Sequence, residues 1–167
     1  NDVAKALGGI FAGFDEIASA NGLRSAWILG DPYVATAGLG RECLDHADRA
    51  AATALELIPS LAAFARRTGL RLHARIGLSS GPVAAGRVGG RDVIYDLWGA
   101  TLDSAARLER EGVADRVLVS ESTRNLLGPR FQLERRIPRS NGRPEPTPGW
   151  FVTRYNASHT TDQCVVV

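Results

Sequence analysis

Residues 75–107 read RIGLSSGPVAAGRVGGRDVIYDLWGATLDSAAR and carry the strongest local signals of the fold. This stretch continues an alternation of apolar and other residues over 72–78, whose period of two predicts a half-buried strand ending at a Ser-Gly-Pro turn. Residues 83–88 and 93–98 are two further extended runs, and the Gly-Gly pair between them tolerates the positive φ of a tight turn. In 101–109 the apolar residues fall on one helical face. The stretch therefore predicts a strand, a hairpin and a helix in that order.

Outside this stretch, helical and extended patterns alternate along the chain. Apolar spacings of four and three predict a helix over 2–20, and an Ala- and Leu-rich helix is predicted over 42–67. Between them, runs at 26–29 and 33–37 flank Gly-Asp-Pro and predict a hairpin with Asp31 at its tip. The remaining predicted elements are a strand at 117–119, a helix at 121–127 capped by Ser120, and strands at 131–137 and 150–155. The pattern implies an α+β domain, with helices packed on one face of a mostly antiparallel sheet.

Composition and charge narrow the class of protein. The 167 residues, 44% hydrophobic and 23% charged, are typical of one globular domain. A formal net charge of +2 from interspersed charges gives no single-sign field that would predict nucleic-acid binding. Basic residues gather within 130–143, where the pattern favours a solvated loop over a patch that binds a polyanion. No apolar run approaches the ~18 residues of a membrane span, so we expect no membrane contact by this domain. Cys43 and Cys164 match no ligand pattern, which indicates reduced thiols and a cytoplasmic location.

Four motifs in register resemble the class III nucleotidyl (adenylate/guanylate) cyclase catalytic domain, of which this chain would be a divergent member. They are ILGDPYVATAG at 28–38, GPV-x-AG at 81–86, YDLWG at 95–99 and T-L-x-x-A-A-R-L-E at 101–109. The resemblance implies the fold of that family, an α+β, ferredoxin-like βαββαβ-type sandwich. It also divides the chain into a cyclase homology domain at 1–155 and a tail at 156–167.

A metal site is implied by the same resemblance. In the family two carboxylates hold two ions, Mg²⁺ or Mn²⁺, and Asp31 matches the second carboxylate; the alternative is an ordinary turn aspartate before proline. The first carboxylate lies on a strand before the first helix, and this sequence begins with that helix. Either the strand lies outside the sequence or the protein lacks it, and two-metal chemistry then fails. Residues 163–167 resemble half of such a strand and would fill its place, unless they form a frayed apolar tail.

Purine recognition is implied only in part. Asp96 matches the residue that accepts a hydrogen bond from the adenine amino group in adenylate-specific members, which favours ATP over GTP. Its usual lysine partner is replaced by Trp27, whose single indole N–H cannot replace an ammonium group. Trp27 would either stack on a base or fill the pocket and support the hairpin.

Phosphate and ribose recognition are implied by the helix at 101–109. Arg107 matches the arginine that meets triphosphate charge in the transition state, and Asp103 replaces an asparagine that orients the ribose. A carboxylate there lacks the amide donor and repels a polyanion, so we expect slow turnover; the alternative for the pair is an i,i+4 salt bridge on a solvated face. Arg143 is the nearest substitute for a phosphate-binding lysine.

The leading hypothesis is therefore an adenylate cyclase-type domain that forms cyclic AMP and pyrophosphate from ATP. Class III sites lie between two subunits, so the resemblance implies a homodimer with sites at the interface, or a heterodimer with a complementary cyclase chain. The alternative is a catalytically silent domain that dimerises or binds a nucleotide to regulate another domain. Either would work in the cytoplasm, alone or as the cytosolic domain of a larger or membrane-attached protein.

Overall fold

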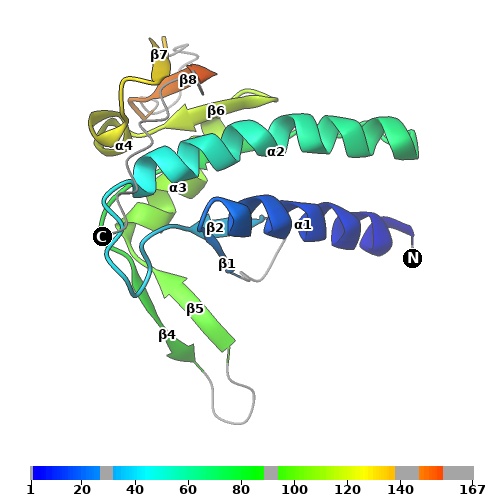
Figure 1. Cartoon of the computed structure of the whole chain (residues 1–167), viewed down its shortest axis with the longest axis horizontal. Coiled ribbons are helices and arrows are strands. Elements are labelled where there is room, and N and C mark those ends of the chain that lie inside the picture. Colours follow the sequence, from blue (N-terminus) through cyan, green and yellow to red (C-terminus); the bar gives the residue numbers. More distant parts are fainter. Residues whose placement is uncertain (1, 27–31, 89–93, 138–146, 156–167) are drawn as a thin grey trace, which may run out of the picture.

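Helices and strands follow one another in the predicted order, although some boundaries differ (Figure 1). The structure, a computed structural model, describes residues 2–26, 32–88, 94–137 and 147–155. Its elements are α1 (Asp2–Ala20), β1 (Arg24–Ala26), β2 (Val34–Thr36), α2 (His46–Thr68), β3 (Arg75–Leu78), β4 (Ala84–Val88), β5 (Ile94–Trp98), α3 (Ala100–Glu111), β6 (Arg116–Val119), α4 (Glu121–Leu126), β7 (Phe131–Arg135) and β8 (Trp150–Tyr155). The predicted α+β class, with a mostly antiparallel sheet, is confirmed.

The strands form one central sheet and two hairpins. The four-stranded sheet has the order β3-β6-β8-β7, in which β3 and β6 are parallel and the other pairs antiparallel. Two separate antiparallel pairs, β1–β2 and β4–β5, correspond to the two predicted hairpins. β1 overlaps the predicted strand at 26–29 only at Ala26, and the predicted tip at Asp31 lies outside the described residues. In Figure 1 the β4–β5 hairpin projects away from the rest of the molecule as an arm.

Helices cover both faces of the central sheet, so the prediction of helices on one face was wrong. Alternation along β6 sends Val117 and Val119 to one face, where they pack with alanines of α2. Leu118 points to the opposite face, where it packs with Leu108 of α3 and Phe151 of β8. Because successive strand residues alternate between faces, a three-residue apolar run builds two cores at once.

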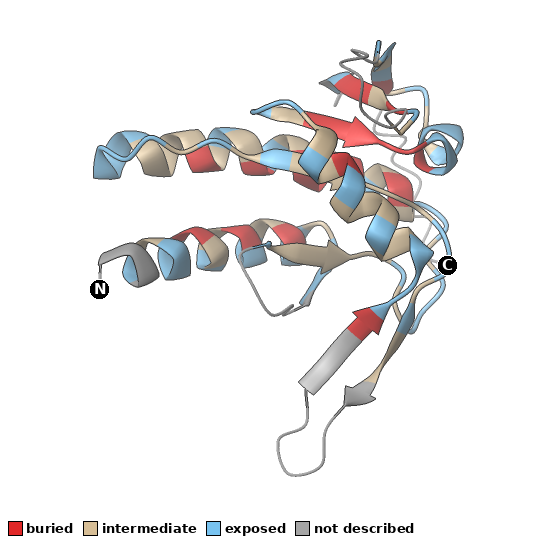
Figure 2. Cartoon of the chain, turned by 180° about the vertical axis from the view of Figure 1, so that it is seen from behind, coloured by how far each residue is buried: buried red, intermediate tan, exposed pale blue. Residues whose placement is uncertain are grey.

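The two long helices lie side by side and form a third core. Ile10 and Phe14 of α1 pack against Leu57 and Leu61 of α2. Figure 2 shows that the buried parts of the two helices face one another. No helix of the described part of the chain is long and apolar enough to cross a membrane.

The start of α2 differs from the prediction. The helix begins at His46 rather than near residue 42, with Asp45 as its N-cap. Gly38 and Gly40 adopt positive φ in the preceding connection, a conformation in which glycine carries no Cβ penalty. Along the helix Ala47, Ala51, Ala54 and Leu61 are buried.

Candidate functional site

The start of α3 is fixed to the turn that precedes the arm. The Thr101 hydroxyl donates to the Pro82 carbonyl at 2.7 Å, and the Leu102 amide donates to Gly99 O at 3.0 Å. Gly99, which joins β5 to α3, has a φ of 134° that favours glycine. The helix therefore leaves the end of β5 in a defined direction.

The inner face of α3 lies directly on β3 and β6. Leu108 is fully buried against Leu118 and Phe151. Gly77 on β3 permits this approach, because an added Cβ would overlap the Ala105 carbonyl oxygen. Packing on one face leaves the opposite face of α3 to carry polar side chains.

Asp103 and Arg107 lie on α3 as predicted, and both are exposed. The predicted alternative for them, an i,i+4 salt bridge to each other, is not what the structure contains. Arg107 Nε instead lies 3.5 Å from Glu111 Oε1, one turn further along, and the arginine side chain is 58% exposed. Its terminal nitrogens, which suit bidentate binding of phosphate oxygens, make no hydrogen bond to any described residue.

Glu111 was not among the residues predicted for the site. Its Oε2 accepts from Arg136 Nη1 and from the Thr147 amide, both at 2.9 Å, and its Oε1 accepts from the Thr147 hydroxyl at 3.2 Å. Burial raises the pKa of Glu111, but these hydrogen bonds outweigh burial and hold it below the ordinary value. The i,i+4 spacing from Arg107 was the signal available in the sequence.

The arm carries Asp96 in β5, where its backbone is paired with Gly86 of β4. The Asp96 side chain lies outside the described part. Trp98 packs across Gly86, whose added Cβ would lie 3.2 Å from the indole ring, and remains 42% exposed. β1 packs beside β5, so the β1–β2 hairpin and the strand with Asp96 are neighbours.

Three predicted site residues, Trp27, Asp31 and Arg143, lie outside the described residues. Within the described ranges no group of three or more His, Cys, Asp or Glu side chains could hold a metal ion. Asp31 supplies a hard oxygen ligand, the type that Mg²⁺ and Mn²⁺ take. Its assignment to metal stays a prediction.

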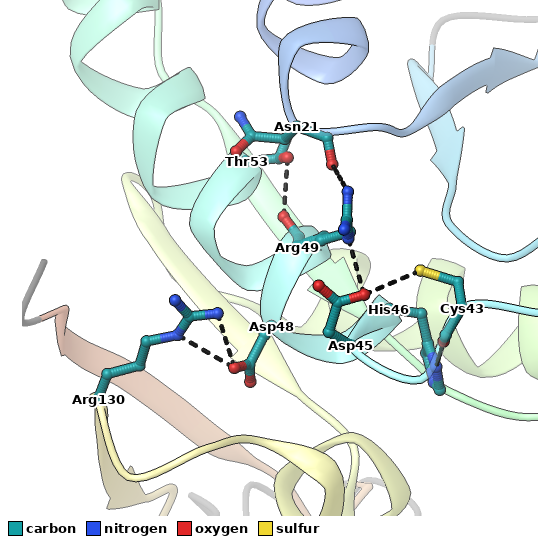
Figure 3. A network of polar contacts seen from close by, with 8 residues as sticks. All are labelled: Asn21, Cys43, Asp45, His46, Asp48, Arg49, Thr53 and Arg130. Atoms are coloured by element: carbon teal, nitrogen blue, oxygen red, sulfur yellow. Dashed lines mark hydrogen bonds and ion pairs between the residues drawn. The ribbon is translucent and has the colours of Figure 1, made fainter. Parts of the chain in front are cut away.

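A polar network around the start of α2 is structural (Figure 3). Asp45 accepts from Arg49 Nε at 2.8 Å and from Cys43 Sγ at 3.2 Å. Burial and the Asp45 carboxylate raise the pKa of the Cys43 thiol, so it stays protonated and is a poor nucleophile. On the other side of the helix, Asp48 holds Arg130 through two contacts of 3.0 and 2.8 Å.

Comparison with known proteins identifies the family. The family model described as "Adenylate and Guanylate cyclase catalytic domain" matches residues 1–143. A membrane guanylyl cyclase of Dictyostelium discoideum is 33% identical over 80% of this chain and 9% of its own length. An adenylate cyclase of Mycobacterium tuberculosis is 31% identical over 81% of this chain and 30% of its own length.

This chain thus spans less than a third of these two curated relatives. Among solved structures, the guanylate cyclase domain of RhGC from Catenaria anguillulae in complex with GTP has a TM-score of 0.83 and 30% identity. The match covers 93% of this chain and 85% of that one. The chain belongs to the adenylate and guanylate cyclase catalytic-domain family.

Proposed function

We propose that this chain forms cyclic AMP and pyrophosphate from ATP in the cytoplasm, with low turnover. In that reaction the 3′-hydroxyl attacks the α-phosphate and pyrophosphate leaves. Catalysis therefore requires positioning of the hydroxyl, its activation, and stabilisation of the negative charge that spreads over the phosphates. Family membership supports cyclisation in general, and the choice of ATP depends on Asp96.

The observation that carries the proposal is the placement of Arg107. It lies on the exposed face of α3, and that helix follows directly from β5, which carries Asp96. Arg107 would bind triphosphate oxygens, and Asp96 would accept from the adenine amino group. Asp31 would hold Mg²⁺ or Mn²⁺, which when bound neutralises phosphate charge and acidifies the hydroxyl.

Low turnover follows from the replaced residues. Asp103 adds negative charge one helical turn from Arg107 and offers no amide donor to the ribose. Trp27 lacks the ammonium group of the usual purine partner, and Arg143 would be a weak substitute for the phosphate lysine. Loss of a single preorganised donor costs about 3–4 kcal/mol of transition-state stabilisation in other enzymes.

We also propose that the site forms between two chains. In the class III arrangement the metal and purine contacts come from one subunit and the helix corresponding to α3 comes from the other. A second copy of this chain, or a complementary cyclase chain, would complete the site. The projecting arm, with its exposed Trp98, supports such a contact because exposed aromatic side chains are enriched at interfaces.

The test is nucleotide cyclisation by the full-length protein with Mn²⁺, supplied with ATP or GTP in separate reactions. We expect cyclic AMP to exceed cyclic GMP and Asp31→Ala to abolish both. Glu16→Ala, which removes an exposed carboxylate of α1, is the matched control and should leave both unchanged. Activity that persists in Asp31→Ala contradicts the metal assignment, whereas nucleotide binding without any product favours a regulatory module.

A further inference from the structure

Glu111, the last residue of α3, is held more firmly by distant residues than by its own helix. Arg136 directly follows β7 and Thr147 lies just before β8, and together they make three contacts of 2.9 to 3.2 Å with its carboxylate. The side chains of Glu111 and Arg136 are only 24% and 14% exposed. The position of the carboxylate is therefore set by the sheet, whatever Arg107 does.

Arg107 stands in the opposite situation. Its side chain is 58% exposed, and its one ion pair among the described residues is the 3.5 Å contact with Glu111. Fixing a long arginine side chain on ligand binding costs rotamer entropy. A fixed acceptor nearby restricts the side chain before the ligand binds, and so lowers that cost. In this pair Glu111 therefore restricts the Arg107 side chain, and not the reverse.

The geometry of the pair leaves the arginine available for a ligand. The closest approach is made by Nε, and the two terminal nitrogens make no hydrogen bond to any described residue, so they can donate to a pair of oxygens. The charge of Glu111 is already balanced by Arg136 at 2.9 Å, which reduces its repulsion of an approaching polyanion. An unpaired carboxylate at this place would repel the polyanion more strongly.

We propose that Glu111 is a positioning residue, which fixes Arg107 through Nε and so presents its terminal nitrogens to the polyphosphate of a nucleoside triphosphate. This inference rests on the proposed function, because it takes Arg107 as the phosphate-binding residue. The opposite prediction holds if Glu111 competes with polyphosphate for Arg107. Polyphosphate would then have to displace Glu111, and removal of the Glu111 charge would tighten binding.

The experiment is a double-mutant cycle on binding, which needs no turnover. Inorganic tripolyphosphate is titrated calorimetrically into the full chain and into Glu111→Gln, Arg107→Ala and the double variant. We expect Glu111→Gln to weaken binding about fivefold where Arg107 is present and less than about twofold in the Arg107→Ala background. Glu109→Gln is the matched control, because Glu109 lies on the same helix and pairs with Arg75 at 3.0 Å instead; it should change binding less than about twofold.

A second variant keeps the proposal testable if Glu111→Gln fails to fold. Thr147→Val removes the hydroxyl that holds Oε1, the oxygen nearest Arg107, and should weaken binding about twofold in the same direction. Tighter binding by Glu111→Gln, equal weakening in both backgrounds, or no tripolyphosphate binding by the unaltered chain would each overturn the proposal. If the cycle behaves as expected while no cyclic nucleotide forms, the proposed reaction fails and the role of Glu111 stands.

Discussion

Gly77 of β3 lies directly beneath the carbonyl oxygen of Ala105 in α3. A Cβ added to Gly77 would overlap that oxygen and come within 3.0 Å of the Leu108 Cβ. A backbone oxygen and a Cβ atom cannot move aside as the end of a flexible side chain can. The helix that carries Asp103 and Arg107 can therefore lie this close to β3 only because residue 77 has no side chain.

We expect Gly77→Ala to destabilise the protein by about 3 kcal/mol, because overpacking against backbone forces α3 away from the sheet. Gly8→Ala is the matched control. Gly8 lies in α1 with nothing within 4 Å of an added Cβ, so alanine should stabilise the helix by about 0.5–1 kcal/mol. Urea unfolding of both variants checks the pair, and a Gly77→Ala variant as stable as the unaltered protein would contradict the packing described here.

Much of this fold could be predicted because its elements carry local signals. The spacing of Ile10 and Phe14 marks the buried stripe of α1, and the Ser120 hydroxyl accepts from the Thr123 amide at 3.1 Å, as its capping position predicts. The start of α2 was placed too early because nothing in residues 42–45 excludes a helix. That boundary depends on the turn through Gly38 and Gly40.

The partners of Glu111 could not be predicted, because they lie 25 and 36 residues away in the sequence. The same holds for the face of the sheet that α3 covers, since an amphipathic helix fits either face equally well. For the candidate site, the sequence predicted Asp103 and Arg107 one turn apart on a helix, and both lie on α3 and are exposed. Motif resemblance identified the family because its residues recur in fixed register over 28–109.

Asp48 joins α2 to the turn before β7, and its loss should cost about 2 kcal/mol. It accepts from the Gly128 amide at 2.8 Å and from two nitrogens of Arg130, and its side chain is 15% exposed. Asp48→Ala leaves these donors without their charged partner. Asp45→Ala, which removes an exposed i,i+4 pair with Arg49, should cost about 0.5 kcal/mol, and equal costs in urea unfolding would refute the distinction.

Glu111 should make stability depend on pH. Its folded pKa is below the ordinary value, so its carboxylate stabilises the protein fully above the unfolded pKa of about 4.3. That contribution is lost as the pH falls through the folded pKa, because the protonated group no longer pairs with Arg136. Unfolding free energies of the unaltered protein and Glu111→Gln should therefore differ at pH 7 and converge towards pH 3. A difference that stays constant over this range would contradict the assignment.

Asp103 should affect stability and turnover in opposite directions. It lies in the first turn of α3, where a negative charge interacts favourably with the helix dipole, so Asp103→Asn should lower stability by about 0.5 kcal/mol. In the proposed site the same change would remove a charge that repels the triphosphate and would add an amide donor for the ribose. We therefore expect cyclic AMP formation to rise about tenfold, equivalent to ~1.4 kcal/mol.

Asp103→Ala separates the two causes of that rise, because alanine removes the charge without supplying a donor. We expect it to recover part of the increase, about threefold. Initial rates with Mn²⁺ and ATP, measured beside urea unfolding of the same preparations, give both quantities. A fall in turnover for Asp103→Asn would mean that the carboxylate itself binds substrate or metal. Removal of a charge that only repels the triphosphate cannot slow the reaction.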